Sequence, residues 1–462
     1  MVPEKIWKIV TDFIYTAALL ITALGVLVVS FPDGAAAILV VIVLSGGFIL
    51  LFRSLTPEKH FITFVFLGAL VLRLGFGIFV HLADLRDFFG GDALTFDYRG
   101  ATLLSSWMGA YIPQWELTLA TSTSGPGWGM TYFVAVIYAA LGRNIFAAQC
   151  FCGVIGAATA PMIYFCSYRI FGHVRTAKVA AVVVAIFPAF VIWSGQLLKD
   201  GLIVFLLVLA MTMVMKLQER ISVVPIILLG FSMVGILSLR FYIFYMVALA
   251  VVGSFFVGVS GSLKSILARV GILIILGIGL TYVGVLRIAS SEYDQYASFE
   301  RIQISRQDLA ARADSGYGAD ADVSSADGAI EVLPLGFVYL MFGPFPWQSG
   351  SFRQSITVPE TLIWWGLMPL LFSGLVYAIR YKLRRALPVL LFTLMLTLAY
   401  SIFQANVGTA YRQRTQIQAF LFIFIAAGWT IRNEKKKDRL MQKAHERELV
   451  IAALKHPVRI TP

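Results

Sequence analysis

Twelve apolar segments, each close to the length that crosses a lipid bilayer, decide what this chain can fold into. A transmembrane helix needs about 20 apolar residues. Only 13% of the 462 residues are charged and the mean hydropathy is +0.83, which excludes a soluble enzyme, a disordered chain and a disulfide-stapled secreted domain. We predict an all-α integral membrane protein, a polytopic helical bundle of about 12 spans (11–13). The expected spans are Ile9–Phe31, Ala36–Phe52, Phe61–Leu82, Ile145–Tyr168, Val179–Gly195, Gly201–Leu217, Val223–Leu239, Phe241–Ser260, Ile266–Leu286, Leu362–Ile379, Ala386–Phe403 and Thr415–Ile431.

The distribution of cations predicts the topology, because cytoplasmic loops of membrane proteins carry an excess of Lys and Arg. With a cytoplasmic N-terminus and twelve crossings, 24 of the 37 Lys and Arg lie inside, 12 lie outside, and Arg73 lies within a span. A further apolar run, Trp128–Leu141, has only 14 residues, and a crossing there would place the basic clusters on opposite sides. We therefore expect this run to lie along the outer interface or to dip in and return.

The chain divides into a membrane domain and a tail. We expect residues 1–431 to form the transmembrane domain, with outer loops at 83–144 and 288–357 that carry juxtamembrane helices, and residues 432–462 to form a basic cytoplasmic tail. Ile288–Leu333 carries nine acids against three arginines, whereas the tail carries nine cations against four acids. A tail of this charge favours contact with anionic lipid at the inner surface. Because this tail accounts for much of the net charge of +12, we expect membrane lipids as partners, and no nucleic acid.

Ionisable residues at the outer ends of spans are the informative candidates, because charge at that position resists a simple packing explanation. Gly90 and Gly91 precede Asp92, and glycines allow a tight turn that aims a carboxylate back at the membrane surface. So placed, Asp92 can act as a general base on an acceptor hydroxyl, or it can belong to a solvated acidic loop. Lys199 and Asp200 lie side by side between two spans and can hold a phosphate or a metal-bound phosphate. The alternative is a surface ion pair.

Three arginines share the same outer level. Arg240 lies in a tight turn between two spans, and Arg412 and Arg414 precede the last span. Paired arginines there run against the positive-inside bias, so we expect an anion to hold them, either a lipid-linked phosphate or ordinary lipid headgroups. If their segment is extended, both side chains point to one side. If it is helical, they diverge by about 200° and only one faces the site. We expect Arg73, within the third span, to be structural.

The order of short motifs along residues 61–217 resembles that of a known superfamily. The motifs are, in order, Arg73, Gly91-Asp92-Ala93, Leu141-Gly142, Ala147-Ala148-Gln149, Tyr168-Arg169-Ile170-Phe171-Gly172, Ala177, Pro188, Ser194 and Lys199-Asp200. The pattern resembles the membrane-embedded GT-C glycosyltransferases, in particular the glycosyltransferase family 39-like branch of the protein O-mannosyltransferases and the aminoarabinose transferase of lipid A. Two positions depart from it, since Ala93 stands where many members have Glu and Phe96 where many have Tyr.

The resemblance implies an enzyme of the cell envelope. Asp92 would be the base or acceptor-binding group of the first outer loop, and Asp200 would position the donor phosphate, sometimes with a divalent cation. We expect an inverting transfer of a sugar from a polyprenyl-phosphate donor to a glycan, lipid or protein acceptor at the outer face of the cytoplasmic membrane. Lys199, Arg240, Arg412 and Arg414 would bind the leaving phosphate. No residue pattern defines a resident metal site. The alternatives are a polysaccharide polymerase or ligase acting on lipid-pyrophosphate glycans, and a lipid or solute transporter.

Overall fold

The computed structural model describes residues 4–29, 33–89, 91–123, 127–256, 263–296, 298–311, 315–318, 320–348 and 352–455. Within these ranges the chain is all-helical, with nineteen α-helices and one short 3-10 helix at Pro346–Gln348. The α-helices are α1 (Glu4–Val28), α2 (Asp33–Ser54), α3 (Lys59–Leu82), α4 (Asp92–Trp107), α5 (Gln114–Thr121), α6 (Trp128–Leu141), α7 (Ile145–Phe171), α8 (Val174–Ile186), α9 (Pro188–Ser194), α10 (Lys199–Glu219), α11 (Val223–Leu239), α12 (Phe241–Phe256), α13 (Leu263–Tyr282), α14 (Val285–Tyr296), α15 (Phe299–Ala311), α16 (Ala326–Phe342), α17 (Phe352–Tyr381), α18 (Leu383–Phe403) and α19 (Val407–Lys455).

Six of these helices are long and apolar enough to cross a membrane, namely α2, α3, α7, α10, α17 and α18. Two bent pairs raise the number to eight if each pair is one span: α8 with α9, bent by 55°, and α13 with α14, bent by 80°. The chain therefore has the architecture of a polytopic helical membrane protein. The described parts of all twelve expected spans fall on helices, and residues 30–31 and 257–260 of two spans lie outside the described residues. α11 and α12 are short, at 17 and 16 residues.

Several helix bounds differ from those predicted. The expected span Val179–Gly195 breaks before Pro188, because proline lacks the amide hydrogen that a continuous helix needs, and α8 ends at Ile186. The span expected at Leu362–Ile379 starts ten residues earlier, at Phe352. The last span belongs to a 49-residue helix, α19, which begins at Val407. One helix of the second outer loop, α16, was predicted only as part of a loop region.

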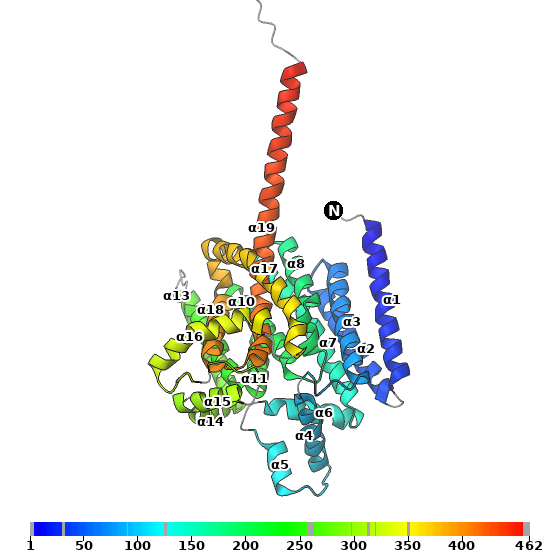
Figure 1. Cartoon of the computed structure of the whole chain (residues 1–462), viewed down its shortest axis with the longest axis vertical. Helices are drawn as coiled ribbons and strands as arrows, with labels where there is room; N and C mark the ends of the chain where they lie inside the picture. Colours follow the sequence, from blue (N-terminus) through cyan, green and yellow to red (C-terminus); the bar gives the residue numbers. More distant parts are fainter. Residues whose placement is uncertain are drawn as a thin grey trace, which may run out of the picture.

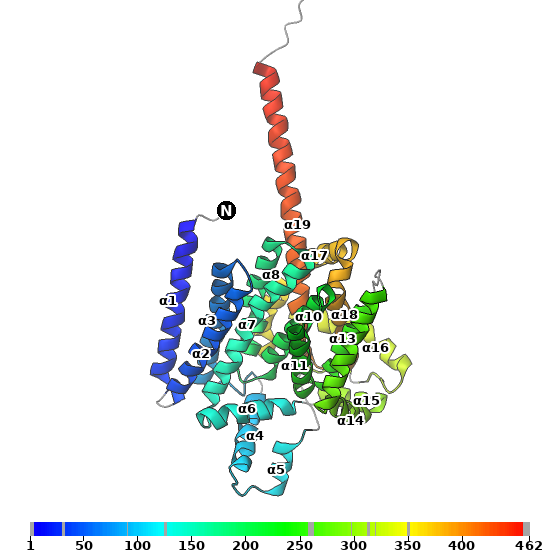
Figure 2. The same ribbon diagram turned by 180° about the vertical axis from the view of Figure 1, so that it is seen from behind.

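The two ends of the bundle differ in character. The N-terminal end of α1 and the far end of α19 lie at one end, while α4, α5, α14 and α15 lie at the other (Figure 1). α6 runs across that second end (Figure 2) and has only 14 residues. α19 continues straight out of the bundle as far as Lys455. The contact of this basic tail with anionic lipid at the inner surface stays a prediction.

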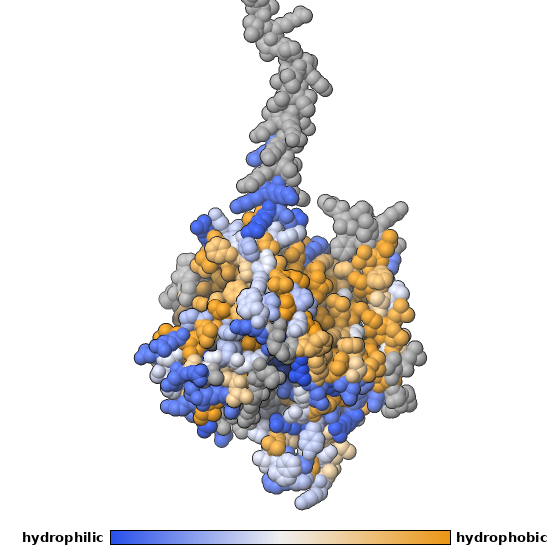
Figure 3. Space-filling model, in the orientation of Figure 1, coloured by the Kyte–Doolittle hydropathy of each residue, from blue (hydrophilic) through white to orange (hydrophobic). Residues whose placement is uncertain are grey.

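Apolar side chains cover the face over α1, α2 and α3, whereas hydrophilic ones gather over α14 and α15 and where α19 leaves the bundle (Figure 3). Among the six candidate spans, α7 and α10 are the most enclosed, each buried over 83% of its most apolar stretch. They place the first residues of α10 at the interior of the second end, beside α9 and α19.

Arg73 donates hydrogen bonds to backbone carbonyls that the break between α8 and α9 leaves without helical partners. The last carbonyls of a helix have no partner within it, and the guanidinium of Arg73 donates to the carbonyls of Ala185 at 3.0 Å and Val184 at 3.4 Å. Its Nε donates to the Ser194 hydroxyl at 2.8 Å. Arg73 is 1% exposed, and these bonds assign it the structural role predicted from the sequence.

Candidate functional site

Asp200 is the centre of a cluster of charges at the second end of the bundle. It lies in the first turn of α10, is 1% exposed, and contacts two guanidinium groups. Arg412 Nε donates to its Oδ2 at 2.7 Å, Arg412 Nη2 forms an ion pair with the same oxygen at 2.6 Å, and Arg240 Nη2 donates to its Oδ1 at 3.3 Å. The two arginines come from α19 and from the junction of α11 and α12. Residues 200, 240 and 412 are thus brought together from three distant parts of the chain.

Asp92 joins the cluster through the same arginine. It is the first residue of α4, and its Oδ2 accepts from Arg412 Nη1 at 2.7 Å. Half of its side chain is exposed, against 15% for Arg412. Gly91 precedes the helix as expected, whereas Gly90 lies outside the described residues. Arg412 therefore bridges a buried carboxylate and an accessible one.

Aromatic groups fix the two guanidinium groups. Arg412 lies over the ring of Trp193, 5.3 Å from its centroid. Arg240 Nη1 donates to the Tyr400 hydroxyl at 3.4 Å, and that hydroxyl donates to Gln416 Oε1 at 2.6 Å. Burial works to lower the pKa of Arg412, but the carboxylates of Asp200 and Asp92 more than offset it, so its pKa lies above the usual value. Both arginines are held as cations.

Lys199 adds a third cation that has no matching anion. Its Nζ lies 6.0 Å from the centroid of the Phe96 ring. Among the described residues, no carboxylate or other hydrogen-bond acceptor pairs with this ammonium group. Gly127 has a φ of +91°, and a Cβ there would lie 2.7 Å from Nζ, so a larger residue would displace the lysine. The site thus combines three cations with two carboxylates.

Arg414 lies elsewhere, and the structure does not support its placement with the other site residues. The segment is helical, so the side chains at 412 and 414 point about 200° apart. Arg414 is fully buried, and its Nη1 donates to the carbonyls of Met341 and Gly343 at 3.2 and 2.7 Å. These carbonyls end α16, where cations are favoured. Arg414 thereby stabilises the turn after α16.

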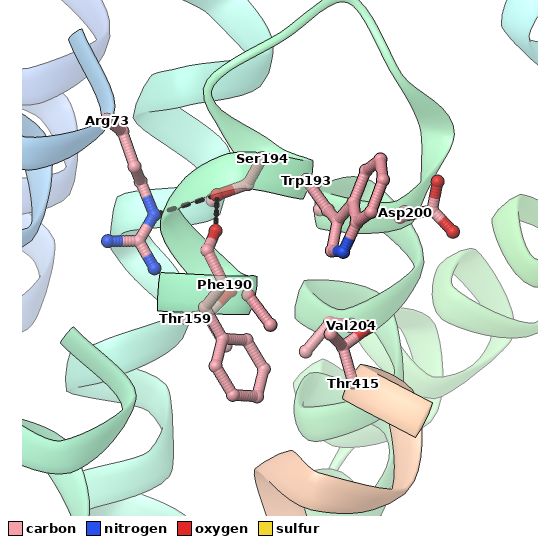
Figure 4. A pocket seen from close by; sticks show the side chains of 11 residues that line it. Arg73, Thr159, Phe190, Trp193, Ser194, Asp200, Val204 and Thr415 are labelled. Carbon is pink, nitrogen blue, oxygen red and sulfur yellow. Dashed lines mark hydrogen bonds between the residues drawn. The ribbon is translucent and has the colours of Figure 1, made fainter. Parts of the chain in front are cut away.

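A small cavity lies behind the charged cluster, on the inner side of Asp200. Arg73, Trp193, Ser194, Asp200 and Thr415 are among the residues that line it (Figure 4). Its volume of about 10 Å³ is close to that needed for one water. The indole Nε1 of Trp193 is buried without a hydrogen-bond partner among the described residues. This cavity is too small for a ligand larger than a water molecule, and the accessible side of the charged cluster is the one where Asp92 lies.

Two features of the site escaped the sequence analysis. The first is the aromatic support from Trp193 and Tyr400, which no spacing rule indicates. The second is the role of Asp97, the other acid of α4. Its carboxylate accepts from the Tyr138 hydroxyl and Arg143 Nη2, both at 2.6 Å. Asp97 therefore fastens α4 to α6, which makes Asp92 the accessible acid of that helix.

The residues around Asp200 do not fit a metal ion. Both of its oxygens already face guanidinium groups, and Arg412 occupies the space between the two carboxylates. In the described part of the chain, no three His, Cys, Asp or Glu side chains are grouped as metal ligands. We therefore derive no step through a divalent cation.

No protein-family model matches this sequence, and no curated protein matches it significantly. The likeness to GT-C glycosyltransferases consequently depends on the ordered motifs alone.

Proposed function

We propose that this protein is a membrane glycosyltransferase that transfers a sugar from a polyprenyl-phosphate carrier to an acceptor at the outer face of the cytoplasmic membrane. The observation that carries the proposal is the meeting of Lys199, Arg240 and Arg412 near the N-terminal ends of α10, α12 and α19. Helix N-termini and cations both favour anions. The accessible end of this site is therefore built for a phosphate at the membrane surface.

The charge balance favours a phosphodiester over a pyrophosphate. Three cations face two carboxylates, which leaves a surplus of one positive charge. A sugar linked through a single phosphate carries one negative charge and would neutralise that surplus, whereas a lipid-linked pyrophosphate carries more. This difference favours the glycosyltransferase over a polymerase or ligase that uses pyrophosphate donors. A transporter would need ionisable groups near the bilayer midplane of several helices, and these groups cluster at one end of the bundle.

In the proposed reaction, the donor phosphate binds Lys199, Arg240 and Arg412, and Arg412 exchanges its contact with Asp92 for the phosphate. The released Asp92 carboxylate takes the proton of the acceptor hydroxyl. The acceptor oxygen forms a bond to the anomeric carbon while the bond from that carbon to the phosphate oxygen breaks. The phosphate leaves with the electron pair, stabilised by the cations. Asp200, buried between two arginines, is not accessible as a nucleophile, so a single inverting displacement is expected.

The decisive experiment measures binding and transfer with the full-length protein in detergent. We expect it to bind a short-chain polyprenyl phosphate more tightly than the matching pyrophosphate, and mass spectrometry of the purified protein to show a bound lipid-linked sugar. Tighter binding of the pyrophosphate would favour the polymerase or ligase. Binding of neither lipid would contradict the proposal.

We further propose twelve crossings, with both termini cytoplasmic and the loop containing Ser324 outside. Ser324 is exposed, and the three native cysteines are buried, so a Ser324→Cys variant offers a single accessible thiol. A membrane-impermeant thiol reagent should label it in intact cells. Labelling only after lysis would place this loop, and the charged site with it, on the cytoplasmic side.

A further inference from the structure

A groove between α4 and α5 is lined in part by the same helix that carries Asp92, and none of its lining residues belongs to the charged site. It has a volume of about 400 Å³ and is lined by Leu94, Thr95, Tyr98, Arg99, Thr102, Glu116, Leu119 and Ala120. Binding pockets for small ligands have volumes of about 300–1,000 Å³. The groove is therefore large enough for part of a substrate.

Helical periodicity connects the groove to the charged site. Thr95, Arg99 and Thr102 follow Asp92 at three, seven and ten residues, and these spacings place all four on one face of α4. A ligand lying along that face would have one end beside the Asp92 carboxylate. The donor cations lie on the other side of Asp92, on α10 and α19. An acceptor bound in the groove would therefore reach Asp92 from the side opposite the donor cations.

The lining of the groove selects the chemistry of the ligand. Arg99 and Glu116 balance each other in charge, so the groove does not favour an anion. Glu116 hydrogen-bonds the Tyr98 hydroxyl, and the Tyr98 ring is 49% exposed. Aromatic rings beside hydroxyl, carboxylate and guanidinium groups suit a sugar, which has apolar C–H faces and hydroxyls at its edge. The lining thus indicates a neutral, polyhydroxylated ligand.

α4 and α5 form a helical hairpin, and its exposed side chains extend the surface of the groove away from the bundle. Trp107, Tyr111 and Trp115 are 50%, 95% and 63% exposed, and α5 lies beyond the ends of the long helices (Figures 1 and 2). Exposed aromatic groups of this kind mark interaction sites. The hairpin itself is firmly seated, because Gly100 lets α4 approach Val134 of α6 so closely that a Cβ would lie 2.5 Å from its side chain.

We propose that the α4–α5 groove binds a neutral oligosaccharide, which is the acceptor, with its terminal hydroxyl at Asp92. This inference rests on the proposed glycosyl transfer and names its acceptor class. Of the possible acceptors, a lipid chain would leave the polar side chains of Arg99, Thr102 and Glu116 in this groove without ligand partners, whereas the hydroxyls of a sugar can pair with them.

The test uses the full-length protein in detergent and a set of fluorescently labelled linear hexasaccharides, namely cellohexaose, maltohexaose, chitohexaose and mannohexaose. We expect at least one to bind, Tyr98→Ala and Glu116→Gln to weaken that binding tenfold or more, and both variants to keep the wild-type affinity for polyprenyl phosphate. Tyr282→Ala is the matched control, because Tyr282 is 92% exposed at the end of α13, and it should bind normally.

Failure of this inference is distinct from failure of the proposed function. If no hexasaccharide binds, or if Tyr98→Ala binds as the wild type does, the groove is not an acceptor site even when polyprenyl phosphate still binds. Binding of the hairpin variants to anionic liposomes more weakly than the wild type, without any hexasaccharide binding, would assign the surface to lipid. If hexasaccharides bind but polyprenyl phosphate does not, the groove stands as a glycan site and glycosyl transfer is contradicted.

Discussion

Arg412 and Arg414 lie two residues apart on α19 and serve two different regions of the molecule. Arg412 contacts the carboxylates of Asp92 and Asp200 in a region that is open on one side. Arg414 is fully buried and contacts backbone carbonyls at the end of α16. A carboxylate partner can be exchanged for a phosphate, whereas a carbonyl at a helix end has no alternative partner once it is buried. The partner thus distinguishes an arginine that can bind a ligand from one that holds the fold.

The other buried arginines follow the same rule. Arg73 donates to carbonyls at the end of α8, and Arg306 donates to the carbonyls of Ile402 and Gln404 at the end of α18, at 2.9 and 2.8 Å. These cations lie at helix C-termini, where the helix dipole favours them. Arg412 instead lies in the N-terminal part of α19, where the dipole favours anions, and Arg240 lies between the C-terminal end of α11 and the N-terminal end of α12. Placement of a cation near a helix N-terminus is unfavourable unless an anion is present, and Asp200 supplies one in the free protein.

The largest expected effect concerns the accessible carboxylate. Asp92→Asn is nearly isosteric and removes only the proton acceptor, so we expect transfer to fall by about 10²–10⁴-fold. Affinity for polyprenyl phosphate should stay the same or rise slightly, because Arg412 loses a competing anion. The measurements are the transfer rate and lipid affinity of the purified variant. Turnover near the wild-type rate would place Asp92 in a solvated loop, and the base would have to be another acid.

The next prediction sets the two neighbouring arginines against each other. Arg412→Ala should weaken polyprenyl phosphate binding by about 10- to 100-fold, the value of one or two charge-assisted hydrogen bonds. Arg414→Ala should instead destabilise the protein by about 1.5–3 kcal/mol, because it leaves buried carbonyls unpaired, while the folded fraction binds lipid normally. Thermal unfolding and lipid affinity are measured on both variants. Equal loss of affinity in the two would show that the partner of an arginine does not indicate its function.

The sequence predicts which charged residues lie at the same level of the molecule. It also contains a signal for which of Arg412 and Arg414 faces the site. The apolar segments place the helices, and the outer charges place Asp92, Lys199, Asp200 and Arg240 at one level. Whether 412 or 414 faces the site depends on where the helix begins. Asn406 Oδ1 accepts from the amides of Gly408 and Thr409 at 2.8 and 3.2 Å, and Asn is among the preferred residues before a first helical turn. Asn406 therefore signals a helix from Val407.

The pairings themselves could not be predicted. Arg412 and Asp92 are separated by 320 positions, and a single sequence gives no rule for which of several outer charges meet. The bend between α8 and α9 depends on Arg73 finding the carbonyls of Val184 and Ala185, which is a tertiary contact. The same holds for Trp193, because an aromatic residue near a span end usually marks the membrane interface.

A smaller effect is expected at Lys199, which tests whether an unpaired cation belongs to the binding region. Lys199→Met keeps the apolar length of the side chain and removes its charge, so polyprenyl phosphate affinity should fall about tenfold, equivalent to about 1.4 kcal/mol. Stability should change little, because no carboxylate in the described residues forms an ion pair with this lysine. Lys178→Met is the control, since Lys178 pairs with Glu58 at 2.6 Å away from the site, and its lipid affinity should match the wild type. A stability loss in Lys199→Met without loss of affinity would make Lys199 structural.

The smallest expected effect separates charge from geometry at position 412. Arg412→Lys keeps the positive charge near Asp200 but removes the planar fork that contacts Asp92 and Asp200 through different nitrogens. A planar guanidinium can bind a phosphate through two parallel hydrogen bonds, which an ammonium group does not reproduce. We therefore expect the lysine variant to bind polyprenyl phosphate about three- to fivefold more weakly than the wild type, and more tightly than Arg412→Ala. Arg414→Lys should leave this affinity unchanged, because its single contacting nitrogen faces carbonyls on the opposite side of α19. An affinity for Arg412→Lys equal to that of the wild type would mean that charge alone recruits the donor, and one equal to that of Arg412→Ala would mean that the fork is indispensable.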